Sequence, residues 1–183
     1  VDRQAHTVAG HSRSIASRQP AIYYENGPEF IAGNSIGVGA MKILILGGNG
    51  MLGPWAVKAM RDRHDILLTD INDPHPDYKG EFLKLSADDV DGVVKAAEGM
   101  DVIINLSVLR PHRQLAFDVN TMGNFAMMTA AREHRIKRVI NTGPHFQMVG
   151  QQYEEWDFNL NPDMAPSPGT RLYAHTKALG QEI

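Results

Sequence analysis

Tyr173 and Lys177 are the two residues near the end of the chain whose types and spacing could carry out chemistry. They lie four positions apart at the start of an amphipathic stretch, Leu172 to Ile183. Positions i and i+4 share one face of a helix, so the phenol and the ammonium come within reach of one another. A cation beside a phenol favours the phenolate, and such a phenol can exchange a proton with a hydroxyl or carbonyl group. The ordinary alternative is a surface pair.

A glycine turn near residue 50 is the second candidate. Gly47, Gly50 and Gly53 follow the apolar run Lys42 to Leu46 at the spacing G-x-x-G-x-x-G and lead into a helical pattern. The first glycine suits a tight turn, the second leaves room for a pyrophosphate, and the third lets the helix pack close to the strand. The free amides and the dipole of that helix favour phosphate. Ordinary glycine-rich turns can share this spacing, so the sequence context decides between a phosphate-binding turn and an ordinary one.

Asp70 supplies that context. It ends the second apolar run, Ile66 to Thr69, twenty residues after Gly50. In the order strand, glycine turn, helix, strand, an acid at this place accepts hydrogen bonds from the adenosine ribose and repels a 2′-phosphate. The sequence therefore predicts NAD rather than NADP as the cofactor. The alternative is a solvated aspartate that opens a turn.

The elements that must position these residues alternate regularly from Met41. Strands are predicted at Lys42 to Leu46, Asp65 to Thr69, Glu81 to Leu85, Val102 to Leu106 and Arg138 to Thr142. Helices are predicted at Met51 to Arg63, Asp88 to Glu98, Arg113 to His134 and Leu172 to Ile183. Apolar strands separated by helices are typical of a parallel sheet that is covered on both faces. The predicted fold is α/β, a doubly wound parallel sheet of the Rossmann type.

Residues 1–40 differ from the rest because they show no hydrophobic period and are interrupted by glycine. They are interpreted as a poorly structured N-terminal extension that precedes an NAD-binding domain at residues 41–183. A targeting segment is the alternative, but acidic residues and the lack of an apolar core region speak against it. Met41 is the favoured natural start.

The composition excludes several classes of protein. The chain has 183 residues, of which 43% are hydrophobic, and a formal net charge of -3. No apolar run approaches the roughly 18 residues of a membrane span. Its 18 basic and 21 acidic residues form no basic block, so no nucleic-acid or membrane partner is expected. The absence of cysteine fits a cytoplasmic protein.

Histidines raise the question of a metal site. His112, His145 and His175 stand near the other candidate residues, but none has a partner at the His-x-x-x-His or His-Glu spacing of a ligand set. No metal site is predicted.

Four segments carry a resemblance to a known family. They are residues 45–53 at the glycine turn, 99–107 at the fourth predicted strand, 120–124 on the long predicted helix, and 173–182 around the Tyr/Lys pair. In these segments the chain resembles the N-terminal part of an extended short-chain dehydrogenase/reductase, from the NAD-dependent epimerase/dehydratase family of nucleotide-sugar enzymes.

The resemblance implies a set of functional residues. NAD is bound by Gly47, Asn49, Gly50, Met51, Leu52 and Asp70, with Leu106 and Ser107 near the cofactor. Tyr173 is the acid/base, and Lys177 is its partner and holds the nicotinamide ribose.

Two departures from the family pattern stand out. The family usually has Ser-Ser or Ser-Thr after the fifth strand, where one hydroxyl completes a catalytic triad, whereas this chain has Asn141-Thr142-Gly143-Pro144. Thr142 is the one hydroxyl there and lies one or two positions early, so it is the candidate for the third catalytic role. Ser86 stands where many members have an aspartate near the adenine.

The function implied is that of an NAD-dependent epimerase/dehydratase-like oxidoreductase. It transfers a hydride to or from a nucleotide sugar or a related hydroxyl or carbonyl substrate. The alternative is a non-catalytic NAD-binding module that reports redox state, which the departure at Thr142 favours. A complete family member continues beyond Lys177 into a substrate-recognising part, so the chain is expected to be C-terminally truncated and inactive when isolated. The resemblance leaves open a homodimer of the full-length protein.

Overall fold

The computed structural model describes residues 39–110, 112–144, 148 and 163–183. The chain divides into two units, residues 1–34 and residues 35–183, and the described residues all belong to the second. Except for Gly39 and Ala40, the predicted extension at residues 1–40 lies outside the described residues and stays a prediction.

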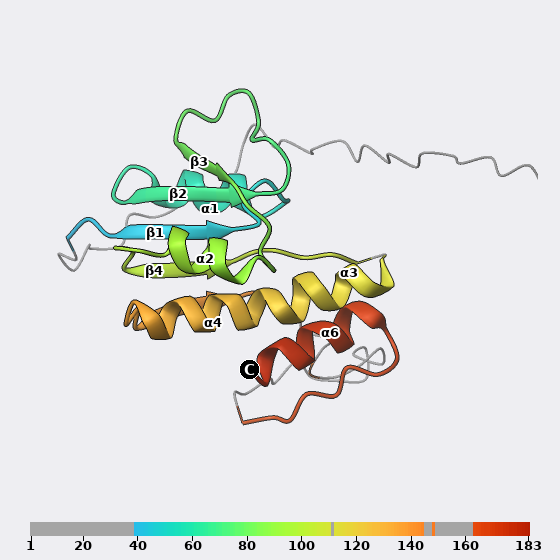
Figure 1. Cartoon of the computed structure of the whole chain (residues 1–183). Helices are drawn as coiled ribbons and strands as arrows, with labels where there is room; N and C mark the ends of the chain where they lie inside the picture. Colours follow the sequence, from blue (N-terminus) through green and yellow to red (C-terminus); the bar gives the residue numbers. More distant parts are fainter. Residues whose placement is uncertain (1–38, 111, 145–147, 149–162) are drawn as a thin grey trace, which may run out of the picture. The chain divides into compact units, whose positions relative to one another are not determined.

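The described strands form one parallel sheet, as the apolar runs predict (Figure 1). They are β1 (Lys42–Leu46), β2 (Asp65–Asp70), β3 (Glu81–Lys84), β4 (Val102–Asn105) and β5 (Arg138–Asn141). Each begins at its predicted residue and ends within one residue of its predicted end. The order is β3-β2-β1-β4-β5, so the direction of winding reverses between β1 and β4. The prediction of a doubly wound α/β sheet is confirmed.

Helices connect and cover the strands. They are α1 (Gly53–Met60), α2 (Val90–Ala96), α3 (Arg113–Phe117), η1 (Asp118–Met122), α4 (Gly123–Glu133) and α6 (Leu172–Gln181). No helix in the described ranges is long and apolar enough to cross a membrane.

Two helices begin later than predicted. The prediction started α1 at Met51, but Leu52 is its N-cap and Pro54 stands in its first turn, where the missing amide hydrogen costs nothing. The prediction started α2 at Asp88, whereas the Asp89 side chain caps this helix by accepting a hydrogen bond of 3.1 Å from the Gly92 amide.

The long predicted helix at residues 113–134 is not one regular helix. Its middle, η1, is a π-helical turn, a local widening that occurs mostly as a single turn within an α-helix and often near functional sites. Asn120 in this turn bonds to both backbone groups of Leu109, at 3.1 Å and 2.8 Å, and to the Thr176 hydroxyl at 2.9 Å. These contacts come from outside the helix, so its own periodicity could not reveal the turn.

The core has two parts because alternate residues of a strand point to opposite faces of the sheet. On one face the core includes Leu44, Leu46, Val93 and Met127, and on the other Ile43, Ile45, Leu68 and Val57. Thus α2 and α4 cover one face and α1 covers the other (Figure 1). Because the strands are parallel, their carboxyl ends all meet at one edge of the sheet, where ligands bind in such folds.

Candidate functional site

The site lies where the winding of the sheet reverses, between the carboxyl ends of β1 and β4. Leu46 pairs with Asn105 across this junction, and Gly47 and Ser107 belong to the two loops that leave it. Gly47 has φ +70°, and a Cβ there would lie 2.4 Å from the Ser107 Cα. Only glycine satisfies both conditions, so the two loops touch through their backbones.

The glycine turn has both the close helix contact and the open space that its predicted role requires. A Cβ at Gly53 would lie 1.6 Å from the Gly48 carbonyl oxygen, so α1 packs directly on the turn. A Cβ at Gly50 would meet, among the described residues, only the Gly47 oxygen at 3.4 Å. The space beside Gly50 is therefore open, and the first turn of α1 carries no acidic residue. This cradle and the amides at the helix start fit a pyrophosphate.

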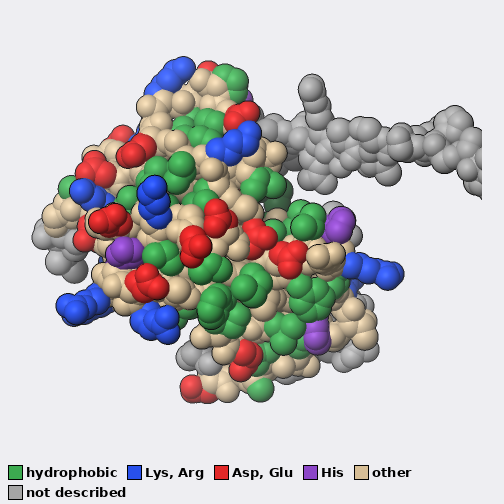
Figure 2. Space-filling view, in the orientation of Figure 1, with side chains coloured by type: hydrophobic (Ala, Val, Ile, Leu, Met, Phe, Trp, Pro, Cys, Tyr) green, Lys and Arg blue, Asp and Glu red, His purple; other side chains and the backbone are tan. Residues whose placement is uncertain are grey.

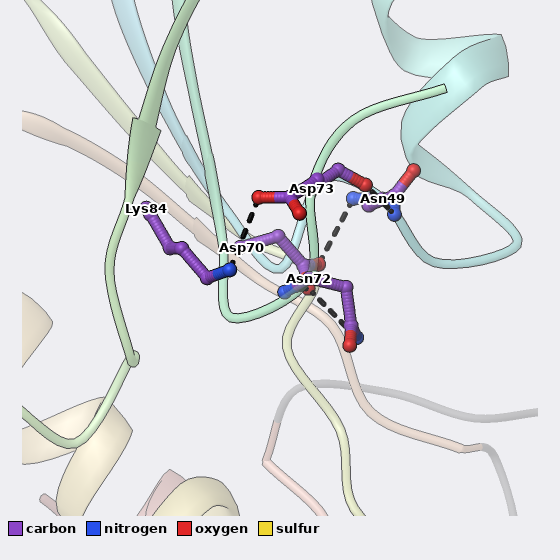
Figure 3. A network of polar contacts seen from close by, with 5 residues as sticks. All are labelled: Asn49, Asp70, Asn72, Asp73 and Lys84. Carbon is purple, nitrogen blue, oxygen red and sulfur yellow. Dashed lines mark hydrogen bonds and ion pairs between the residues drawn. The ribbon is translucent and has the colours of Figure 1, made fainter. Parts of the chain in front are cut away.

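Asp70 is buried and fixed between the glycine turn and the loop after β2 (Figure 3). Its Oδ2 accepts a hydrogen bond of 3.0 Å from the Asn49 amide, and its Oδ1 accepts bonds of 3.0 Å and 3.3 Å from Asn72 N and Nδ2. The Asn49 side chain donates to the Asp73 carbonyl at 2.8 Å, and Asp73 pairs with Lys84 at 3.0 Å. A carboxylate has about four lone-pair sites, so Asp70 keeps acceptor capacity for a ribose hydroxyl.

Lys177 reaches the junction from α6. Its side chain is buried, and its Nζ donates a hydrogen bond of 2.8 Å to the Ser107 carbonyl oxygen. Burial lowers the pKa of Lys177 from 10.5 to about 8, because a charged group is disfavoured away from water. The structure thus brings Lys177, Ser107 and the glycine turn together.

Tyr173 lies one helical turn before Lys177, as predicted, near the start of α6. Its half-buried ring lies under the guanidinium of Arg110, whose Cζ is 5.2 Å from the ring centroid. Such a cation–π contact is an attraction between the positive charge and the ring face. Sequence reasoning missed Arg110, which has no motif and reaches the ring only through the fold.

At the two departures from the family pattern, the side-chain hydroxyls of Thr142 and Ser86 both bond to other residues of the chain. The Thr142 hydroxyl donates to the Asn105 carbonyl at 2.9 Å, beside a bond of 3.1 Å from the Thr142 amide. Its proton is therefore committed to the backbone of β4. The Ser86 hydroxyl bonds to the Asp88 carboxylate. His145 lies outside the described residues.

A cluster of asparagines around the buried Asn105 was also missed. Asn105 ends β4, and its side chain bonds to Asn124 of α4, to Asn141 of β5 and to Ser107. The available signal was a polar residue that ends an otherwise apolar strand, Val102–Asn105. Its partners are distant in sequence and could not be identified from it.

Of the three histidines considered as metal ligands, the structure describes His112 and His175. His112 Nδ1 accepts a hydrogen bond of 3.3 Å from the Leu115 amide and so caps α3, while His175 is exposed. In the part of the chain that the structure describes, no group of three acidic or histidine residues is placed to hold a metal ion.

Several solved structures share this fold. The enzyme WbmG from Bordetella bronchiseptica in complex with NAD and UDP is 19% identical with a TM-score of 0.65, covering 78% of this chain and 48% of that chain. Uronate dehydrogenase from Agrobacterium tumefaciens is 22% identical with a TM-score of 0.62, covering 78% and 54%. Thermus thermophilus UDP-glucose 4-epimerase in complex with NAD is 19% identical with a TM-score of 0.63, covering 78% and 49%. The chain therefore spans about half the length of these structures.

The sequence comparisons bear on the family. None of the curated proteins matches the chain. The NAD dependent epimerase/dehydratase family matches residues 43–183, a range that includes all four segments of the resemblance, and its description agrees with NAD as the predicted cofactor. The chain belongs to the NAD dependent epimerase/dehydratase family.

Proposed function

We propose that this chain forms the NAD-binding part of an oxidoreductase that acts on a nucleotide sugar or a related hydroxyl or carbonyl substrate. The observation that carries the proposal is the bond from Lys177 Nζ to the Ser107 carbonyl. It joins α6, which bears Tyr173, to the junction between the glycine turn and β4. Three separate parts of the sequence thus meet at the one place where such sheets bind dinucleotides.

The proposed cofactor contacts follow from this arrangement. The turn residues Gly47, Asn49, Gly50, Met51 and Leu52 hold the pyrophosphate, Asp70 takes the adenosine ribose, Leu106 and Ser107 line the space after β4, and Lys177 holds the nicotinamide ribose. The side chains of Met51 and Leu52 are 69% and 55% exposed.

Bound NAD would supply the hydride acceptor, and the chain's own residues would move the proton. Tyr173 takes a proton from a substrate hydroxyl or returns it to a carbonyl. Lys177 has a pKa of about 8, so at pH 7 it is mostly charged and can hold the nicotinamide ribose. Thr142 is the candidate for the third role. The bond from its hydroxyl to Asn105 leaves the oxygen able to accept, but not donate, a further hydrogen bond.

The second candidate is a non-catalytic NAD-binding module. The committed proton of Thr142 favours it, because no triad hydroxyl then remains free to donate to a substrate. Both functions require NAD binding, so a titration of the chain with NAD tests what they share. Hydride transfer in a longer protein that contains this chain separates them.

We also propose that such a longer protein forms a homodimer. Large apolar side chains are exposed along α4 and α6, among them Phe125, Met128 and Leu179, which are 44%, 39% and 41% exposed. Figure 2 shows hydrophobic side chains gathered over these helices. Exposed apolar surface of this kind often marks an interface. Sedimentation velocity of the longer protein tests the proposal, and a monomer at micromolar concentration would contradict it.

A further inference from the structure

We propose that Asn105 is a positioning residue for Lys177, acting through Ser107. Its importance for the reaction rests on the proposed function, whereas its effect on Lys177 does not. The inference comes from a continuous set of bonds that runs from α4 and β5, through the Asn105 side chain and Ser107, to the lysine on α6.

The first link fixes Ser107. The Asn105 Oδ1 accepts two hydrogen bonds from it, at 3.0 Å from the amide and 2.5 Å from the hydroxyl. An asparagine side chain that bonds to the amide two residues later shapes a tight turn. The amide and the hydroxyl of Ser107 are both held on the Asn105 side. Its carbonyl is left to accept the bond from Lys177 at 2.8 Å.

The second link fixes Asn105 itself. Its Nδ2 donates to the Asn124 Oδ1 at 2.7 Å and to the Asn141 Oδ1 at 3.2 Å. The side chains of Asn105 and Asn124 are fully buried. A flipped Asn105 amide would set an NH2 group against the Ser107 amide N–H, which can only donate. Only one orientation of the amide therefore satisfies all four contacts.

The third link is the dependence of Lys177 on this carbonyl. Among the described residues, Lys177 Nζ has the Ser107 oxygen as its hydrogen-bond acceptor, and the lysine is 1% exposed. A buried ammonium is sensitive to the loss of its acceptor. The place of the Ser107 carbonyl therefore decides the environment of the lysine charge.

The test measures the pKa of Lys177 and the affinity for NAD in the chain as it stands. Asn105→Leu has a similar size and removes every bond of the amide, whereas Ser107→Ala removes only the hydroxyl bond and is expected to leave the fold intact. Asn141→Ala is the matched control, because it removes the longer bond of the cluster and leaves Ser107 held. The pKa is read from the pH dependence of the NMR signal of labelled lysine, assigned with Lys177→Met.

We expect Asn105→Leu to move the pKa of Lys177 by more than about half a unit and Ser107→Ala to move it less but in the same direction. Entry of water would raise the pKa of Lys177, and loss of the acceptor from a buried ammonium would lower it. A change in either direction therefore shows that the surroundings of the lysine have changed. NAD affinity should fall about tenfold in Asn105→Leu, the effect of losing one hydrogen bond to a charged group. Asn141→Ala should change neither quantity.

An unchanged pKa in folded Asn105→Leu would overturn the proposal. If that variant does not fold, an unchanged pKa in Ser107→Ala would overturn it. A chain that binds no NAD but shows these pKa changes would contradict the proposed function and leave the positioning role in place. The two failures are therefore distinguishable.

Discussion

Lys177 Nζ and the Ser107 carbonyl oxygen lie 2.8 Å apart, although seventy residues separate them in the sequence. This bond closes the site, because it attaches the last described helix to the loop that touches the glycine turn.

The stability of the chain should depend on pH through Lys177. Its pKa is about 8 in the folded chain against 10.5 as the ordinary value, so between these limits the unfolded chain holds more protons and the free energy of unfolding rises with pH. Below pH 8 the full cost of the buried charge is present. Relative to Lys177→Met, the free energy of unfolding of the wild-type chain should rise by about 3 kcal/mol between pH 8 and pH 10.5. Urea unfolding of both proteins across this range measures it, and a constant difference would contradict the burial of a charged lysine.

Asp70 should set the choice of cofactor. NAD should bind more tightly than NADP, and Asp70→Arg should narrow or reverse this preference, because it removes a hydroxyl acceptor and adds a phosphate partner. Calorimetric titration with each cofactor measures the ratio. Asp73→Asn is the matched control, since it breaks the exposed pair with Lys84 and leaves Asp70 in place. Tighter binding of NADP to the unaltered chain would refute the assignment.

Gly180 should be needed for the close packing of α6 against η1 and α4. A Cβ there would lie 2.2 Å from the Asn124 Nδ2 and 2.5 Å from the Asn120 carbonyl oxygen. Because one of these atoms is backbone, the helix itself must shift. We expect Gly180→Ala to lower the free energy of unfolding by about 1–3 kcal/mol and to weaken NAD binding by moving Lys177.

Gly123→Ala is the control for this helix test, because its Cβ would meet Ala87 at an ordinary 3.4 Å. Alanine is the better helix former, so this variant should be neutral or slightly stabilising. Equal behaviour of the two variants in urea unfolding would show that the close approach at Gly180 is unimportant.

Tyr173 should carry the proton transfer in a longer protein that contains this chain. Tyr173→Phe keeps the ring and deletes the acid/base, so turnover should fall by roughly 10² to 10⁴-fold with little change in NAD affinity. Lys177→Met should weaken NAD binding as well. Thr142→Ala tests the third catalytic role, because near-normal turnover would show that the hydroxyl, which donates to the Asn105 carbonyl, is not needed. A loss as large as that of Tyr173→Phe would instead place Thr142 in the triad. Full turnover in Tyr173→Phe would show that Tyr173 does not carry the proton, and no turnover in the unaltered protein would favour the redox-reporting module.

The sequence predicts the centre of the sheet well because β1, β4 and most of β2 are buried on both faces and read as apolar runs. Residues of β1 such as Leu44 and Ile45 are fully buried although they face opposite sides. The parallel arrangement then places Gly47, Asp70 and Leu106 at one edge without further information. Those parts of the site depend on local pattern and strand order alone.

Other parts of the site depend on contacts between distant segments. The π-helical turn is bonded through Asn120 to Leu109 and Thr176, and neither partner is visible in the helix's own period. The same holds for Asn105, whose amide is satisfied by residues from α4 and β5. Buried polar groups need partners, but the sequence does not say which residues those partners are.

The contact between Gly47 and Ser107 also has a mechanical consequence. The two loops meet backbone to backbone, with no side chain between them to change rotamer and absorb a movement. Packed protein interiors are barely compressible and transmit strain. A small displacement of the glycine turn is therefore passed to Ser107 and through its carbonyl to Lys177, so the pyrophosphate and the nicotinamide ribose of a bound dinucleotide would rest on parts of the chain that move together.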